Sequence, residues 1–342
     1  MIKKHDPDIR SGLKKRRITY FVCLCFLCLL LLLLITLNMT QGQKTYSLAE
    51  VFRSLFSPEE STSIYIVNKL RFPRTMAAIF CGMAFGIAGN TFQTLLGNPL
   101  ASPDIVGVSS GSAVAAVFCL LVLHTNRGMV SLMAVLFGLA TATLLYLLSY
   151  QNGYSTTRLI LTGIGTQAFF SALINWMVMK AAEYDVPTAM RWMTGNLNEL
   201  SPDALPWLYI LVPICILCIG FMTNHMKALE LGDTYATILG LSVKKVRILL
   251  IGLAVLLLAI ATSVSGPIAA VSFLAGPIAS RLCGKNYSNT LSSGLTGAIL
   301  VLLADFVGQN LTPTRYPVGI ITGLLGAPYL IYLLIRFGKG AK

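Results

Sequence analysis

Long apolar runs separated by short polar segments dominate the pattern of the chain. The first run occupies residues 18–38, and about 20 apolar residues are enough for a helix to cross a bilayer. Similar windows recur to the end of the chain, with loose boundaries. They lie near 75–95, 105–124, 128–150, 158–180, 205–223, 246–265, 268–284, 291–309 and 318–336. The pattern therefore predicts an all-α, polytopic membrane protein with about ten transmembrane helices, forming one permease domain over 1–342.

Composition and charge support a membrane location and suggest an orientation. Hydrophobic residues make up 55% of the 342 residues and charged residues only 11%, against roughly 25% in soluble domains. The net charge of +13 could suggest nucleic acid in a soluble protein, but here basic residues mark cytoplasmic loops. An even number of spans places both termini on one side. We expect residues 1–17 to be a cytoplasmic basic tail, both termini to be cytoplasmic, and no nucleic-acid partner.

The spans contain few ionisable groups and no catalytic motif, and this reduces the number of possible functions. Ion-coupled transporters need ionisable groups at depth, yet Lys180 and Asp305 lie near predicted outer ends and Asp104 near an inner one. The sequence has no phosphate-binding GxxxxGK[ST] loop and no nucleophile–base pair or HExxH zinc motif. Its eight cysteines lie in or beside apolar runs. We expect no catalytic residues, no bound cofactor and no metal site, and a translocation subunit that draws its energy from another chain.

One polar stripe interrupts the apolar surface of the fifth span. Gly163, Gln167, Ser171 and Asn175 recur every four residues and so share one helix face. Such a stripe lines either a tight helix–helix seam or a wet passage, and periodicity alone favours neither. The candidate passage residues are Gln167, Ser171 and Asn175. In the second span, Gly82 and Gly86 form a GxxxG pair typical of helix packing.

A polar segment, GNPLASPDIVGVSSGS at 97–112, separates the second and third spans. Its prolines forbid a continuous helix, and an aspartate where a helix restarts can stabilise free backbone amides. We expect a broken corner on the cytoplasmic side, near an inner gate. Our hypothesis is that it packs beside the passage and moves with the cytoplasmic loop at 225–246; the alternative is a rigid support, and the sequence does not separate the two. The corner residues are Asn98, Pro99, Pro103, Asp104 and Gly107.

A cytoplasmic loop at 225–246 has the features of a coupling element. It contains a short helical pattern from Asp233 to Leu239, then Gly240 and a basic end. Glycine, aspartate and serine fit its caps and turns. A short amphipathic helix at a surface would suit docking to an energy-supplying partner. The alternative is an ordinary solvated loop.

Ordered motifs after the first span resemble the FecCD-type permeases of ABC importers for iron–siderophore, haem and cobalamin. The RFPR entrance at Arg71–Arg74, Gln93 with the NPLASP turn, and Gly107–Gly111 occur in the family order. The likeness continues through 229–247, 265–282 and 302–334, so that the family core covers 71–336. Within the family, the chain looks most like ferric-siderophore subunits of the enterobactin type. One departure is Ile278, which stands where many relatives carry histidine. No role of that imidazole can be transferred.

The resemblance implies a type II importer fold in the cytoplasmic membrane, with the substrate passing between two permease subunits. A paralogous second permease is favoured, and a homodimer is the alternative. Two ATPase subunits would hold ATP and Mg and dock below, and an extracytoplasmic binding protein would dock above. The implied cargo is a ferric siderophore, and the alternative cargoes are haem and cobalamin. A weaker alternative to the ABC importer itself is an ion-coupled secondary transporter. Implied binding-protein contacts are Arg71, Arg74 and Arg315, and implied ATPase contacts are Gly232, Asp233, Ala236, Leu239 and Gly240.

Overall fold

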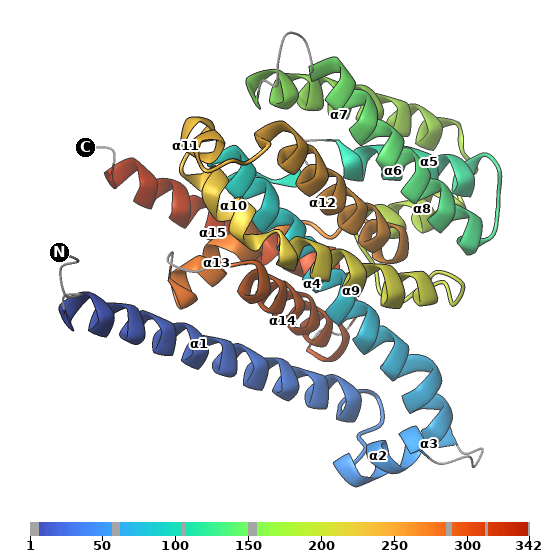
Figure 1. Cartoon of the computed structure of the whole chain (residues 1–342). Coiled ribbons are helices and arrows are strands. Elements are labelled where there is room, and N and C mark those ends of the chain that lie inside the picture. Colours follow the sequence, from blue (N-terminus) through green and yellow to red (C-terminus); the bar gives the residue numbers. More distant parts are fainter. Residues whose placement is uncertain are drawn as a thin grey trace, which may run out of the picture.

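The computed structural model describes residues 7–56, 62–103, 107–149, 156–284, 289–311 and 314–340. Over these residues the secondary structure is helical, and no strand occurs (Figure 1). Asp104 lies outside the described residues. A π-helical turn, Ile66–Arg71, leads directly into α4. The helices are α1 (Pro7–Thr40), α2 (Leu48–Phe56), α3 (Thr62–Tyr65), α4 (Phe72–Leu96), α5 (Val108–Leu121), α6 (Arg127–Ser149), α7 (Thr156–Lys180), α8 (Val186–Met193), α9 (Leu205–Phe221), α10 (Thr223–Glu230), α11 (Asp233–Ile238), α12 (Val243–Ser265), α13 (Val271–Cys283), α14 (Thr290–Asn310) and α15 (Val318–Gly340).

Each of the ten apolar windows coincides with a helix of the structure. In the described part of the chain, six helical stretches are long and apolar enough to cross a membrane. A seventh candidate is α9 with α10, which are bent by 52° relative to one another. The apolar helices α5 and α13, with 14 and 13 residues, are shorter than a full span. The all-α membrane fold is therefore confirmed, while the count of ten spans is approximate.

Helix α4 forms the centre of the bundle and packs against α12, α13 and α14 (Figure 1). The contact with α14 depends on glycine. A Cβ atom added at Gly82 would lie 2.5 Å from the carbonyl oxygen of Gly297, and one at Gly86 would meet the carbonyl oxygen of Ser293. Such close backbone approach is the usual role of small residues in membrane helix pairs. The GxxxG pair of α4 is therefore a packing device.

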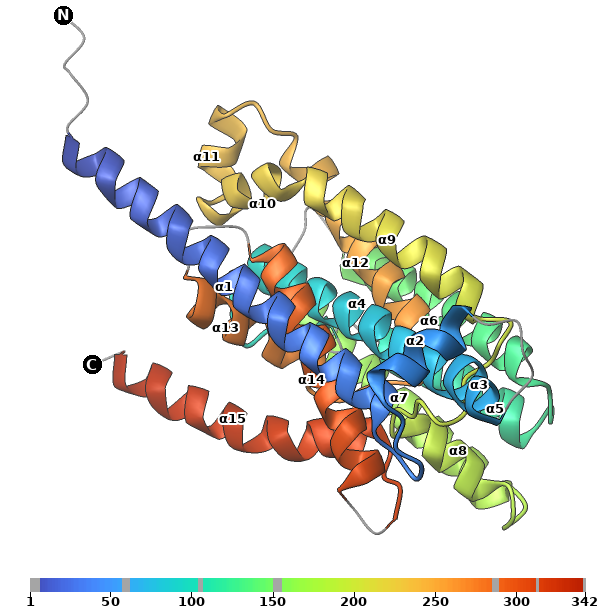
Figure 2. The ribbon, with the colours of Figure 1, turned by 90° about the horizontal axis from the view of Figure 1, so that it is seen from below.

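Helices α1 and α7 lie at the edges of the bundle. Only 11% of the most apolar window of α1 and 17% of that of α7 is buried within the chain. α7 packs on α5 and α6, at the top of Figure 1, whereas α1 contacts α14 at the opposite edge. Figure 1 shows α2 and α3 at the lower right, beyond the end of α1, and Figure 2 shows α10 and α11 at the opposite, upper left side. The topology predicted from the basic residues makes these the outer and the inner end, and each carries a candidate site.

Candidate functional site

The outer end of α4 is tied to α14 by an ion pair. Arg74 donates from Nε to Oδ2 of Asp305 over 2.8 Å and from Nη2 to Oδ1 of the same carboxylate. The Asp305 side chain is 3% exposed and that of Arg74 18%. Arg74 Nη1 also donates to Oδ1 of Asn198, which accepts a second hydrogen bond from Gln309. One guanidinium thus links two helices and the loop between α8 and α9.

The same loop is anchored at two further points. The backbone N–H of Asn196 donates to the carbonyl oxygen of Ser265, at the end of α12. The N–H of Gly319, at the start of α15, donates to the carbonyl oxygen of Gly195. Helices α4, α12, α14 and α15 therefore contact this loop, in addition to α8 and α9, which it connects.

Arg71, the other arginine of the entrance motif, holds the segment that follows α1. Its guanidinium donates to the backbone carbonyls of Met39 and Lys44. It also lies over the ring of Tyr46, with Cζ 5.1 Å from the ring centroid. The side chain is half-buried by these contacts. Arg71 and Arg74 both have partners within the chain, and their binding-protein role stays a prediction.

A polar cleft of about 480 Å³ opens beside these arginines. Arg315 lines it and is exposed, and Lys44 contributes a further cation. Asp305 is the acidic residue in the lining, and Arg74 already neutralises it. The cleft therefore presents excess positive charge, which would attract acidic groups of a docking protein.

The polar stripe of α7 faces away from the rest of the chain. Gln167, Ser171 and Asn175 are exposed, whereas Gly163 is buried. Beside them, Thr162 Oγ1 lies 3.2 Å from Ser149 Oγ of α6. Within this chain, the polar stripe therefore takes part in helix–helix packing only in the first turns of α7. The three exposed side chains are free to line a passage or to face another subunit.

The predicted corner begins earlier than its prolines. Helix α4 ends at Leu96 because Gly97 adopts a left-handed conformation with φ 60°, and its N–H bonds back to Gln93 and Thr94. Asn98 Oδ1 then accepts from the N–H of Leu100, forming a turn. Pro103 is buried, and Gly107, with φ 71°, precedes α5. The helix break is confirmed. Gly97 ends the helix, and Pro99 prevents α4 from continuing as one helix.

The corner is attached to α13. Gln93 donates from Nε2 to the carbonyl oxygen of Phe273 over 3.1 Å, and Gly276 leaves room for the amide oxygen of Gln93. Ser102 Oγ lies 3.5 Å from Ser272 Oγ. Any movement of the corner would therefore involve α13 as well.

The predicted coupling loop forms two short helices, α10 and α11, joined at Gly232 with φ 97°. Gly240, with φ 82°, follows α11. Asp233 turns back and accepts two hydrogen bonds from Arg247 of α12, at 2.7 and 3.2 Å. The Ala236 side chain is fully buried within the chain. The exposed apolar side chains are Leu231, Tyr235, Ile238 and Leu239.

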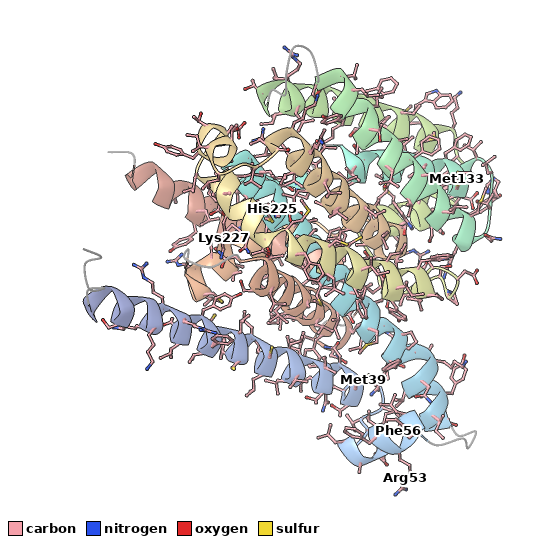
Figure 3. The ribbon with its side chains drawn as sticks, viewed as in Figure 1. Met39, Arg53, Phe56, Met133, His225 and Lys227 are labelled. Carbon is pink, nitrogen blue, oxygen red and sulfur yellow. The ribbon has the colours of Figure 1, made fainter. Side chains whose placement is uncertain are left out.

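The corner and the coupling loop border one inner cleft of about 540 Å³. Asn98 and Pro99 line one part, and Gly232, Asp233 and Arg247 another. Lys227, labelled on α10 in Figure 3, also lines it. The structure thus brings together two motifs that are more than 100 residues apart in the sequence.

Several residues of these sites have no prominent sequence pattern. Asn198 and Arg247 lie in ordinary polar and basic stretches, and only the fold shows their partners. Asp305 had a recognisable signal, because a carboxylate inside an apolar run needs a partner. Gly97 had one too, because glycine just after an apolar run commonly ends a helix.

Known proteins match this chain over nearly all of its length. The model of the FecCD transport family matches residues 30–336. The chain belongs to the FecCD transport family. The ferric enterobactin transport system permease protein FepG of Escherichia coli K12 is 35% identical over 308 residues, which are 87% of this chain and 91% of FepG. The achromobactin transport system permease protein CbrC of Dickeya dadantii is 35% identical over 303 residues, 86% of each chain.

A solved structure gives the same architecture. A metal-chelate type ABC transporter in an inward-facing conformation is 27% identical and superposes with a TM-score of 0.80. The match covers 93% of this chain and 99% of that chain. This FecCD family member is therefore a membrane-embedded transport permease with the fold of an ABC importer subunit. The expected family and fold class are confirmed.

Proposed function

We propose that this chain is the permease subunit of an ABC importer that carries a ferric siderophore across the cytoplasmic membrane into the cytoplasm. One observation carries the cargo class: FepG and CbrC, which match over most of their length, are permeases for enterobactin and achromobactin. The substitution of a family histidine by Ile278 leaves the individual siderophore open.

Separate ATPase subunits supply the energy and hold ATP and Mg, two per transporter. The exposed side chains of Leu231, Tyr235, Ile238 and Leu239, in and beside α11, support this assignment, because α11 lies at the predicted inner end of the bundle (Figure 2). Apolar anchors of this kind carry most of the energy of protein docking. The sequence-predicted contacts Gly232, Leu239 and Gly240 lie in this segment, and Tyr235 and Ile238 extend it.

A binding protein delivers the siderophore to the outer end, and a paralogous second permease completes the passage. The excess positive charge of the outer cleft favours an acidic docking surface on the binding protein. Arg315 is the most accessible arginine of the cleft. The exposed stripe of Gln167, Ser171 and Asn175 is an uncharged lining suited to a large chelate. Both termini are cytoplasmic, in agreement with the basic residues of the first 17 positions.

Uptake by whole cells tests this function. Cells that lack their own siderophore permeases would receive this chain with its ATPase, second permease and binding protein. We expect accumulation of iron supplied as radiolabelled ferric enterobactin or another ferric siderophore. Accumulation should be lost when the ATPase carries a substitution in its phosphate-binding lysine, and should persist with a protonophore while cellular ATP is maintained.

Parallel cultures supplied with haem or cobalamin distinguish the alternative cargoes. Uptake of either, without uptake of any ferric siderophore, would replace the proposed cargo but keep the importer. Uptake that continues with the inactive ATPase and stops with the protonophore would instead indicate an ion-coupled secondary transporter. Co-purification followed by mass determination identifies the second permease as a paralogue or as a copy of this chain.

A further inference from the structure

Helix α2 is a fixed structural element with a well-formed start. Ser47 and Glu50 form a reciprocal capping box. The Ser47 N–H donates to Oε2 of Glu50 over 2.7 Å, and the Glu50 N–H donates to Ser47 Oγ over 3.3 Å. The helix therefore begins at a defined residue.

One side of α2 packs on the outer end of the bundle. Val51 is 5% exposed and clusters with Met39 of α1 and Val67 of the π-helical turn. Asn68 Nδ2 donates to the backbone carbonyl of Ser54 over 2.8 Å, and Ser54 is buried. These contacts hold α2 level with the last turn of α1, where the long apolar helix ends.

A second apolar side of α2 has no partner within the described part of the chain. Leu48, Phe52 and Phe56 are 52%, 63% and 81% exposed. They follow one another at intervals of four residues and so form one ridge. On an ideal helix this ridge lies directly beside the buried side, whereas Glu50 and Arg53 lie on the remaining, polar side. Figure 3 shows Arg53 projecting away from the rest of the chain.

A helix with one buried side, one exposed apolar side and one charged side suits the boundary between protein, lipid and water. The neighbouring α1 exposes Leu29, Leu32 and Leu33 in a window of mean hydropathy 3.0, a composition typical of a helix that lies against acyl chains. Because Val51 packs on Met39 in the last turn of α1, the ridge of α2 lies at the level where α1 would leave the membrane. Amphipathic helices with aromatic side chains and a charged polar side lie in the headgroup region.

We propose that α2 lies in the outer membrane–water interface, with Leu48, Phe52 and Phe56 inserted among the acyl chains of the outer leaflet. The helix anchors the outer end of α1 to the membrane surface. Because Arg71 holds the segment between α1 and α2, this anchor also fixes the level of the Arg71 side chain relative to the bilayer. The partner is a phospholipid surface.

Photo-cross-linking in proteoliposomes of phosphatidylethanolamine and phosphatidylglycerol tests the proposal. Variants would carry p-benzoylphenylalanine in place of Phe52, of Phe56, of Arg53 or of Leu29, one at a time. We expect phospholipid-mass adducts on the peptides carrying positions 52 and 56, in several-fold higher yield than at 53. Leu29, 70% exposed on α1, is the positive control for lipid contact.

The aromatic replacements at 52 and 56 are exposed and conservative, so folding is expected to be retained and is checked by monodispersity in detergent. Lipid adducts at position 29 with none at 52 and 56 would overturn the proposal. So would cross-links from 52 and 56 to the binding protein or to a second permease in the assembled transporter, since the ridge would then be a protein interface.

Discussion

The Arg74 guanidinium binds the buried Asp305 carboxylate in a bidentate ion pair that joins α4 to α14. Asp305 is shielded from water, so it depends on this one cation for its charge to be compensated. Removing one partner of a buried pair commonly costs about 3–5 kcal/mol, because the other charge stays behind uncompensated. The arginine of the entrance motif therefore has a structural function in addition to any docking function.

Substitution Arg74→Ala should lower the thermal stability of the purified protein, since it leaves the Asp305 carboxylate without its cation. We expect a loss of about 3 kcal/mol in the free energy of unfolding. The matched variant Arg315→Ala, at an exposed side chain, should leave the unfolding temperature unchanged and weaken association with the binding protein. Equal unfolding temperatures for both variants would show that the ion pair contributes nothing to stability.

The sequence was sufficient to predict the spans and the family but not the partners of the charged residues. The apolar windows located α4 and α14, and Asp305 was recognisable as a carboxylate near the end of a span. That Arg74 compensates it depends on the crossing of two helices 231 positions apart in the chain. Likewise, Leu239 and Ala236 both fit a coupling motif, yet only the packing of α11 decides that Ala236 points inward.

The Asp233–Arg247 pair should transmit movement between the coupling helix α11 and α12. We expect Asp233→Asn to lower the number of siderophore molecules transported per ATP hydrolysed by several-fold. Asp233 is 58% exposed, so the loss of stability should stay below about 1 kcal/mol. Transport and ATP hydrolysis would be measured together in proteoliposomes with the full complex.

Two further variants distinguish the loss of the Asp233–Arg247 ion pair from a general effect of changing the charge. The exchange Asp233→Arg with Arg247→Asp should restore part of the coupling, because the ion pair is rebuilt in reverse. Lys245→Gln, at an exposed position two residues before Arg247, should change nothing. If the exchange variant is no better coupled than Asp233→Asn, the role assigned to the pair is wrong.

A methyl group at the α4–α14 crossing should disturb the core. Gly82→Ala would place its Cβ 2.5 Å from the backbone oxygen of Gly297, so the helices must separate. We expect a loss of about 1–3 kcal/mol in unfolding free energy, the usual cost of overpacking. Gly252→Ala on α12, where no heavy atom lies within 4 Å of the added Cβ, is the control and should be neutral or slightly stabilising. Indistinguishable thermal unfolding of the two variants would contradict the close approach.

The start of α2 should weaken in acid. The Ser47 backbone N–H, followed by its hydroxyl, holds the pKa of the Glu50 carboxyl below its ordinary value of 4.5. A lowered folded-state pKa adds stability that is present above pH 4.5 and lost as the pH falls through the folded value. Hydrogen-exchange protection of residues 48–56, corrected for the intrinsic rate, should therefore be lower at about pH 3 than at about pH 7. In Glu50→Ala, protection should be low at both pH values, and any remaining acid-induced drop would assign the effect to another group.

The inner cleft permits a direct test of whether the corner moves with the coupling loop. Asn98 and Glu230 line this cleft from the two motifs and are both exposed, so cysteines placed there would accept a bifunctional maleimide. The native Cys25, Cys28 and Cys218 are at least partly exposed and would first be replaced, whereas the other five are buried.

The nucleotide dependence of this cross-link decides between a moving and a rigid corner. With the ATPase subunits bound, we expect the yield between Asn98→Cys and Glu230→Cys to differ between the nucleotide-free state and the state trapped with ATP and vanadate. The pair Ser102→Cys with Ser272→Cys is the reference, because the two hydroxyls already lie 3.5 Å apart and the corner is attached to α13 there. A constant yield for the reference with a changing yield across the cleft would mean that the corner and α13 move together relative to the coupling loop. Yields that stay constant across the nucleotide states for both pairs would make the corner a rigid support.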